Sequence, residues 1–445
     1  MQSFLSLNPL GQVPQLAAQR RVHQAFRWLH LHDGLFMDWQ QALVRIPAPP
    51  FGEAQRAAWL LEQFTAIGLT GITIDQEGNV LGLLPTAAET EAKAADDQHA
   101  VVLSAHIDTV FPAGTEVVPQ ISGTRLVAPG ACDNAAGVTG LLAMAAALID
   151  ASITLPCPVL FIGNVGEEGE GDLRGMRYLY QRSAWRDRIA AHIVLDGAGH
   201  EVAVTEALGS RRFLATVTGP GGHSWTDAGS PNPIAILSHA IAALTPAGPL
   251  RENRTVLNVG TIEGGSSVNA IPEHARARFD LRSTSSEDLI CLEVELHRAI
   301  EDAVLAANAA AADIRKRSPN MQASFTIERI GHRPAGRLEN ALNGQMLYDD
   351  LLAVDRHLGI RTEPRIASTD ANIPLSIGIP AISIGAGGDG GGIHTRNEWY
   401  DATHREQALK RILLLLMLTA ERQQSQAKKS AAADGPRPFV SGISE

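Results

Sequence analysis

The segment AVVLSAHID, residues 100–108, is a run of apolar residues that ends in a histidine and an acid. A continuous Val, Leu and Ala run without alternating polar positions is typical of a strand that is covered on both faces, as in a parallel α/β sheet. The same pattern recurs at 158–165 and 191–198, with helical patterns between at 137–150 and 173–185. The sequence therefore predicts an α/β fold with a mainly parallel sheet.

Acidic and imidazole side chains follow these apolar runs or Gly-rich turns. They are His106, Asp108, Asp133, Glu167, Glu168, Asp196 and His394. In an open α/β sheet, ligands bind beyond the carboxyl ends of the strands, which is where several of these residues fall. Nitrogen and oxygen donors of this kind suit divalent zinc, cobalt or manganese, and there are more of them than one metal requires. The pattern predicts a two-metal hydrolase.

The rhythm of the chain changes between residues 209 and 336. Strands and helices there follow the order β-α-β-β-α-β, which is that of a ferredoxin-like α+β unit. The α/β pattern resumes at 337, so we expect 209–336 to be a domain inserted between the two parts of a catalytic domain, 1–208 and 337–423. Residues 424–445 have the composition of a linker and are expected to be disordered.

Bulk composition limits the classes of function. A chain of 445 residues exceeds the roughly 250–300 residues of a single core, so two domains are expected. The net charge of -11 argues against a nucleic-acid partner. Three scattered cysteines and the lack of a secretory pattern at the N-terminus predict a cytoplasmic protein. The apolar run ILLLLMLTA is shorter than the ~20 residues of a bilayer span, so we expect no membrane partner.

The spacing of the acids suggests separate roles. Asp108 lies two residues after His106 on a strand, so the two share a face and the acid could orient the imidazole. Asp133 lies in a Gly-bounded loop and is the candidate for a carboxylate that bridges two cations. Adjacent residues point in different directions, so Glu168 could hold a metal while Glu167 acts as general base and later as general acid.

These motifs resemble the aminoacylase, glutamate carboxypeptidase and tripeptidase (peptidase T-like) family of co-catalytic dizinc exopeptidases. The resemblance extends from IPAPPFGE at 46–53 to the last helix and includes an inserted dimerisation, or lid, domain. It implies two divalent ions per subunit, zinc in the first place, with cobalt and manganese also suited. It assigns one metal to His106, Asp133 and Asp196 and the other to Asp133, Glu168 and His394. It makes Glu167 the general base and Asp108 the acid that orients the histidine.

The inserted domain carries further residues that match the family. The histidine of GGHSW, His223, would reach across a homodimer to the developing oxyanion in the partner's site. Asn269 in GGSSVNAIP and Arg282 in FDLRS match positions that contact substrate, and an Arg suits a terminal carboxylate. Arg282 could instead be an ion-pair partner of Asp280 or Glu273.

We therefore predict an exopeptidase or amidohydrolase that cleaves a short peptide or an N-acyl amino acid through metal-bound hydroxide. A deacylase or carbamoyl-amidohydrolase that acts on a non-peptide amide is an alternative, and a non-catalytic relative that binds peptides is another. Cys132, next to the bridging acid, and the segment STDAN at 368–372 leave the substrate subgroup open. The run GGDGGG before His394 is expected to be flexible backbone that places this histidine.

Overall fold

The computed structural model describes residues 9–85, 99–244, 255–312 and 322–433, without the side chains of 424 and 426–433. The chain divides into two compact units. Within the described residues, the larger unit holds 9–205, 337–365 and 369–433, and the smaller unit holds 206–336 and 366–368. The smaller unit therefore takes in a short segment that the sequence pattern did not predict, because Leu208 N donates to Ala367 O at 2.8 Å and Arg333 donates to Ser368 at 3.2 Å.

The larger unit is built on a twisted central sheet with the strand order β1-β2-β6-β3-β7-β17-β8-β15, in which β16 also pairs with β8. Its middle strands, β6, β3, β7 and β17, are parallel, whereas β2 and β8 join them antiparallel. The strands are β1 (Thr70–Ile74), β2 (Val80–Leu83), β3 (Ala100–His106), β6 (Val159–Asn164), β7 (Ile189–Leu195), β8 (Val202–Ala207), β15 (Gly336–Arg337), β16 (Glu363–Ala367) and β17 (Ala381–Ile384). Every residue of β3 is buried, as its unbroken apolar run predicts. The predicted α/β class with a mainly parallel sheet is confirmed.

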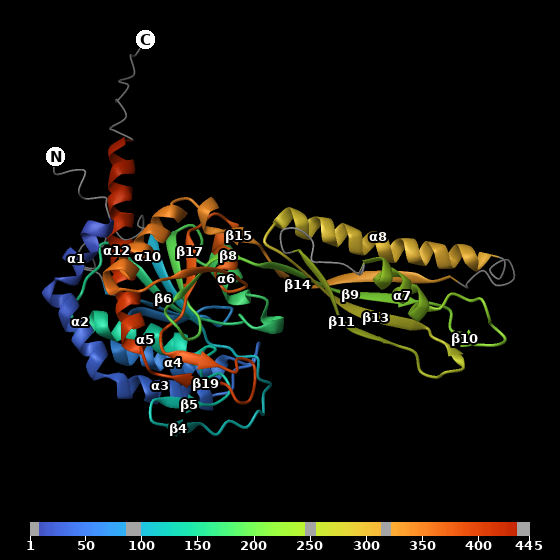
Figure 1. Cartoon of the computed structure of the whole chain (residues 1–445), viewed down its shortest axis with the longest axis horizontal. Helices are drawn as coiled ribbons and strands as arrows, with labels where there is room; N and C mark the ends of the chain where they lie inside the picture. The colour runs from blue at the N-terminus through green and yellow to red at the C-terminus, as the bar shows by residue number, and fades with distance from the viewer. Residues whose placement is uncertain (1–8, 86–98, 245–254, 313–321, 434–445) are drawn as a thin grey trace, which may run out of the picture. The chain divides into compact units, whose positions relative to one another are not determined.

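Helices cover both faces of this sheet (Figure 1). On one face α5 and α12 contact β3 and β7, and further helices pack outside α5. On the other face, apolar residues of α6 and α11 form a core with the sheet. The helices are α1 (Pro9–Ala17), α2 (Arg20–Leu31), α3 (Asp33–Arg45), α4 (Ala54–Ile67), α5 (Ala135–Asp150), α6 (Arg174–Gln181), α10 (Gly344–Leu358), α11 (Asn372–Ser376) and α12 (Arg405–Ala433).

Helix α12 contains the long apolar run near the C-terminus. Residues Ile412–Ala420 are buried, which is the core position that the run predicted. No helix in the described part of the chain has the length and apolar composition of a bilayer span. The helix continues to Ala433, so the prediction of disorder from residue 424 is wrong for this stretch. Its Gln, Lys and Ala residues are good helix formers and can extend an existing helix; residues 434–445 lie outside the described residues.

A small antiparallel sheet was not predicted. It has the order β18-β19-β5-β4, from β4 (Gln120–Ser122), β5 (Arg125–Val127), β18 (Asp389–Gly391) and β19 (Trp399–Asp401). Part of the GGDGGG run is thus a paired strand, not flexible backbone. Its glycines allow close packing, since a Cβ on Gly390 would lie 2.4 Å from the Cys132 sulfur.

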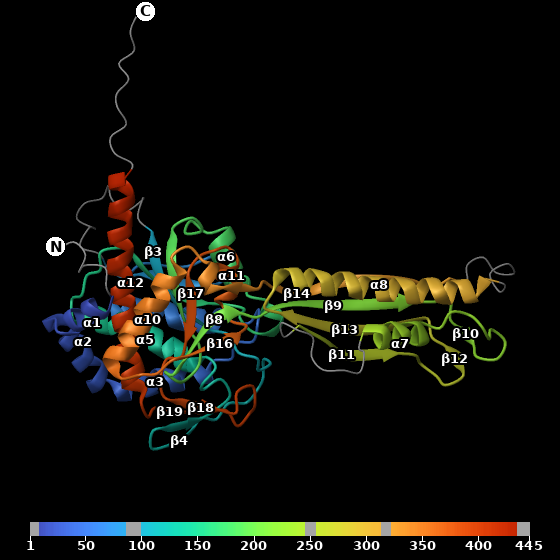
Figure 2. The ribbon, with the colours of Figure 1, turned by 45° about the horizontal axis from the view of Figure 1, so that its top comes forward.

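The smaller unit has the predicted order of elements (Figure 2). They are β9 (Gly209–Thr218), α7 (Pro233–Leu244), β11 (Val256–Gly264), β13 (His274–Ser283), α8 (Ser286–Ala310) and β14 (Ser324–Arg333), with the short pair β10 (Gly222–His223) and β12 (Ala270–Ile271). The sheet is antiparallel in the order β11-β13-β9-β14, the ferredoxin-like arrangement. Alternate residues of β13 are buried, because α7 and α8 cover one face of the sheet and leave the other open.

Candidate metal centre

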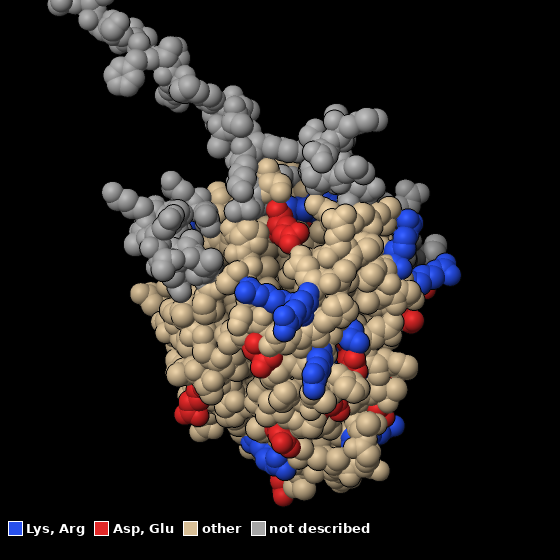
Figure 3. All heavy atoms as spheres, turned by 90° about the vertical axis from the view of Figure 1, so that its left-hand side faces the viewer, with Lys and Arg blue, Asp and Glu red and all other residues tan. Residues whose placement is uncertain are grey.

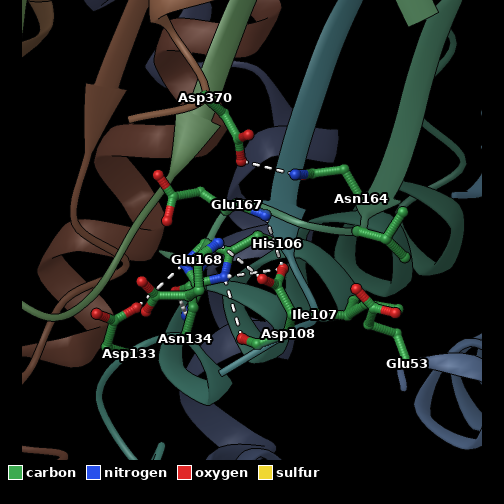
Figure 4. Close-up of polar contacts among 12 residues, drawn as sticks. Glu53, His106, Ile107, Asp108, Asp133, Asn134, Asn164, Glu167, Glu168 and Asp370 are labelled. Carbon is green, nitrogen blue, oxygen red and sulfur yellow. Dashed lines mark hydrogen bonds and ion pairs between the residues drawn. The ribbon is translucent and has the colours of Figure 1, made fainter. Parts of the chain in front are cut away.

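Three parallel strands end side by side at the predicted site. β3 ends at His106, which is in register with Asn164 at the end of β6, and β7 ends directly before Asp196. The loop after β6 carries Glu167 and Glu168, as Figure 4 shows beside His106. Asp133 precedes α5, and His394 lies between β18 and β19. The sheet thus brings together side chains that are far apart in the sequence.

The first group of possible ligands comprises His106, Asp133 and Asp196. His106 Nε2 lies 3.0 Å from Asp133 Oδ1 and 3.7 Å from Asp196 Oδ1. One ligand atom from each residue falls within 4.8 Å of the others. His106 is almost fully buried, whereas the two acids are partly exposed, so the group opens to solvent on the carboxylate side.

The second group comprises Asp133, Glu168 and His394, and it shares Asp133 with the first. His394 Nε2 lies 3.2 Å from Asp133 Oδ2 and 3.2 Å from Glu168 Oε1. Each oxygen of Asp133 therefore faces a different imidazole. Asp133 Oδ1 is buried and makes no hydrogen bond of acceptable geometry among the described residues, although His106 Nε2 approaches it to 3.0 Å. A carboxylate with its two oxygens presented to two separate donor groups has the geometry of a bridging ligand.

His106 is oriented by its own strand end. Its Nδ1 lies 3.2 Å from the Asp108 main-chain oxygen and 3.6 Å from Asp108 Oδ1, which leaves Nε2 for the acid cluster. The Asp108 carboxylate also accepts the main-chain N–H of Glu167 at 3.0 Å and of Glu168 at 2.7 Å. Asp108 is fully buried. Asp108 therefore orients the histidine, mainly through its main-chain oxygen, and holds the backbone of the two glutamates through its carboxylate.

The charges of the cluster are strongly coupled. Burial, followed by the charge of Asp133, raises the pKa of Glu168 to about 7. The hydrogen bond with Asp133 raises the pKa of His394 to about 9. The charge of Glu168 contributes to this shift, whereas partial burial opposes it. Burial would lower the pKa of His106, but its carboxylate neighbours raise it well above its usual value. The convergence of several carboxylates and two imidazoles favours bound positive charge, and this donor set suits divalent cations.

Glu398 is a residue that sequence reasoning missed. Its buried carboxylate accepts the main-chain N–H groups of Gly130 at 3.1 Å, Cys132 at 2.8 Å and Asp133 at 2.7 Å. Glu398 lies four residues after His394, so it fixes the loop of the shared acid from the segment that carries the late histidine. Its only signal in the sequence is an acid near that histidine, and nothing in the spacing shows which groups it meets.

Two further buried polar residues support the site. Asn134 accepts the N–H of Gly137 and of Gly197 and donates to Leu195 O, so it ties the start of α5 to the loop of Asp196. Asp370, in the STDAN segment, is fully buried and accepts a hydrogen bond from Asn164 at 2.7 Å (Figure 4). Burial raises the pKa of Asp370 to about 7.

The three residues predicted in the inserted domain lie in the smaller unit. The β10–β12 pair sets His223 opposite Ala270, next to Asn269, so the structure brings these two predicted residues together. Arg282 lies near the other end of the neighbouring strand β13, and its Nε donates to Asp280 Oδ2 at 2.7 Å. Arg282 therefore has the ion-pair partner that the sequence offered as an alternative, and it does not join the other two.

The fold and the grouped side chains define a class of protein, an α/β domain with carboxylates and imidazoles placed so that they could hold metal ions. The chain belongs to Peptidase family M20/M25/M40, whose model matches residues 102–421. This match confirms the family that the motifs resemble, and it places the chain among hydrolases of amide bonds.

Individual relatives are more distant. The chain is 27% identical to a succinyl-diaminopimelate desuccinylase of Methylocella silvestris over 248 residues, which are 51% of this chain and 63% of that relative. Among solved structures, a tripeptidase of Staphylococcus aureus has a TM-score of 0.68 at 20% identity, covering 87% of this chain and 99% of its own. A dinuclear metal-binding peptidase of Bacillus subtilis has a TM-score of 0.63 at 16% identity, covering 88% and 99%. These structures share the fold.

Proposed function

We propose that this protein is a metal-dependent exopeptidase that hydrolyses the amide bond of short peptides or N-acyl amino acids. The observation that carries the proposal is the shared Asp133, whose two oxygens face His106 on one side and His394 on the other. Glu167 lies beside this arrangement in the same buried loop as Glu168. The acid–base residue and the ligands are thus parts of one cluster.

The donor set fits two divalent ions. His106, Asp133 and Asp196 would hold one ion, and Asp133, Glu168 and His394 would hold the other. When bound, two such ions polarise the scissile carbonyl and lower the pKa of a bound water. Imidazole and carboxylate donors suit zinc first, with cobalt and manganese as alternatives.

Glu167 is the proposed general base. Its carboxylate would take a proton from the attacking water and later donate it to the leaving nitrogen. Asp108 fixes the main-chain N–H of Glu167, so the base is attached to the same anchor as His106. Such a base is oriented before substrate arrives, which lowers the entropic cost of reaching the transition state.

His223 is the proposed donor to the developing oxyanion. Its Nδ1 accepts the main-chain N–H of Trp225 at 3.1 Å, so a neutral His223 carries its proton on Nε2. The side chain is exposed, which leaves Nε2–H available to a substrate. Preorganised donors of this kind stabilise the charge that forms on the carbonyl oxygen.

We propose that the site is completed in a homodimer, in which His223 serves the partner subunit. The edge strand β11 and the exposed apolar side chains Ile290 and Val294 of α8 support an interface on the smaller unit. An unpaired strand edge and an exposed apolar ridge are both surfaces that proteins cover by association.

Asn269 and Arg282 are the proposed substrate contacts. Asn269 adjoins His223, which supports a role next to the reacting carbonyl. Arg282 could bind a substrate carboxylate only if that group competes with Asp280 for the guanidinium. The likeness to a desuccinylase favours a deacylase or carbamoyl-amidohydrolase that acts on a non-peptide amide as the second candidate. A peptide-binding relative without activity is the third, and the complete set of ligands and base counts against it.

We further propose a cytoplasmic protein whose partners do not include nucleic acid. All three cysteines are free thiols, two of them buried, which suits a reducing compartment. Basic and acidic side chains are interspersed among uncharged ones on the face in Figure 3, without a broad basic field. Nucleic-acid binding requires such a field.

The test is hydrolysis of a panel of di- and tripeptides, N-acyl and N-carbamoyl amino acids by protein loaded with zinc, manganese or cobalt, with a chelator control. Glu167→Gln should lose at least about a hundredfold in kcat while it keeps two equivalents of metal. Glu170→Gln, an exposed acid of the same loop, is the matched control. Cleavage that survives full metal removal, or an active Glu167→Gln protein, would reject the proposal.

A further inference from the structure

The loop that carries Glu167 and Glu168 has an unfavourable backbone conformation. Among its residues, Asp172 and Leu173 have positive φ angles of 49° and 60°. Side chains other than glycine rarely adopt this left-handed region, because Cβ approaches the following carbonyl oxygen. Strain of this kind persists only where surrounding contacts hold it in place, and it is concentrated at functional sites. The contacts that hold this loop are therefore of interest.

Arg174, the first residue of α6, joins the loop to two other segments. Its Nη1 donates to Glu77 O at 2.7 Å and to Glu77 Oε1 at 2.9 Å, and its Nη2 donates to Glu53 Oε1 at 2.7 Å. Glu77 lies in the β1–β2 turn, and Glu53 precedes α4 and is 4% exposed. The guanidinium thus connects three segments through charge-assisted hydrogen bonds, of which the one to the buried Glu53 is largely shielded from solvent.

The stem of Arg174 packs against the residue before the general base. A Cβ built on Gly166 would lie 2.6 Å from Arg174 Cγ and 2.8 Å from its Nε. The main chain closes the same loop, because Leu173 N donates to Gly166 O at 2.8 Å. Gly166 has a φ of 69°, so both the space and the backbone conformation require glycine there. Arg174 therefore restrains the position at which the chain enters Glu167.

We propose that Arg174 is a positioning residue for Glu167, with Glu53 and Glu77 as its anchors. The inference rests on the proposed function for the role of Glu167, but the restraint on the loop does not. Asp108 holds the main-chain N–H of both glutamates, and Glu168 has a further support, since its carbonyl oxygen accepts Gly171 N at 2.8 Å. Loss of Arg174 should therefore displace the base more than the metal ligand.

The kinetic test compares Arg174→Met with Arg422→Met. Arg422 forms a similarly buried ion pair with Asp350 in the same unit, so its loss controls for general destabilisation. Arg174→Met should lower kcat about 10- to 100-fold, since small misplacement of an acid–base group is costly. KM and the number of bound zinc equivalents should stay within twofold of the wild type. Arg174→Lys, which keeps the charge but reaches one anchor, should recover part of kcat.

Hydrogen exchange of the intact protein gives a readout that is independent of activity. Peptides that cover 165–173 should exchange faster in Arg174→Met and not in Arg422→Met. Glu53→Gln and Glu77→Gln each remove the charge of one anchor and should give smaller changes in the same direction. These two variants serve as the test if Arg174→Met does not fold. Unchanged exchange in all of these variants overturns the inference, as does a kcat equal to that of Arg422→Met.

The two failures can be told apart. If the wild type cleaves no amide on the panel, the proposed function fails, and exchange alone decides whether Arg174 restrains the loop. If the wild type is active and Glu167→Gln is not, a fully active Arg174→Met protein refutes the positioning role and leaves the proposed function intact.

Discussion

Replacing Asp108 with Asn should reduce both stability and activity. The buried carboxylate accepts two main-chain N–H groups, of Glu167 at 3.0 Å and of Glu168 at 2.7 Å. Asn keeps one acceptor oxygen and turns an NH₂ group towards the other N–H, so one charge-assisted hydrogen bond is lost and a buried donor has no partner. Loss of a charge-assisted hydrogen bond costs about 1.5–3 kcal/mol, and a buried donor without a partner costs about 1–3 kcal/mol. We expect a fall of about 3 kcal/mol in the free energy of unfolding.

The assay is urea unfolding of the metal-free protein at pH 7, followed by kcat after reloading with zinc. Because the amides of the base and of a ligand both move, kcat should fall about 10- to 100-fold. Asp350→Asn is the matched control: it breaks the buried pair with Arg422 and should cost stability without changing kcat. A loss below about 1 kcal/mol for Asp108→Asn, or a kcat equal to that of the control, would refute the reasoning.

Three further predictions concern other parts of the molecule. Burial lowers the pKa of His192 to about 3, so the folded protein is at its full stability above about pH 6.5 and loses stability as the pH falls towards 3. The free energy of unfolding should fall by about 2 kcal/mol between pH 7 and 5. His192→Gln should flatten this dependence of the unfolding free energy on pH, measured by urea unfolding, and an equal dependence would contradict a neutral buried imidazole. Zinc at a hundredfold excess over its Kd should stabilise the protein by about 2.7 kcal/mol for each ion bound. Asp133→Asn should reduce the two bound equivalents measured by elemental analysis, and retention of both would exclude a shared ligand. His223→Ala should lower kcat about 10²- to 10³-fold with the sedimentation mass unchanged, and an unaffected kcat would reject the oxyanion role.

The inserted unit and the central sheet could be predicted because their signals are local. A fully buried strand needs an unbroken apolar run, and β3 has one; a sheet with one open face needs alternation, and β13 has it. The small sheet of β4, β5, β18 and β19 could not be predicted, since its strands are short and the pairing that joins its two hairpins, β5 with β19, crosses a long stretch of sequence. The end of α12 was misjudged because a polar, Ala-rich composition suits a linker and a helix equally well.

The sequence by itself determined the fold class, the order of the candidate ligands and the pairing of each with a strand end or Gly-rich turn, because backbone hydrogen bonding and burial constrain which residues can stand there. Only the tertiary structure decided how these groups are held. Glu398 reaches the amide of Asp133 across 265 positions, and Arg174 reaches Glu53 across 121. Contacts of this kind depend on how strands and loops pack in space, and side-chain identity at either end does not reveal them.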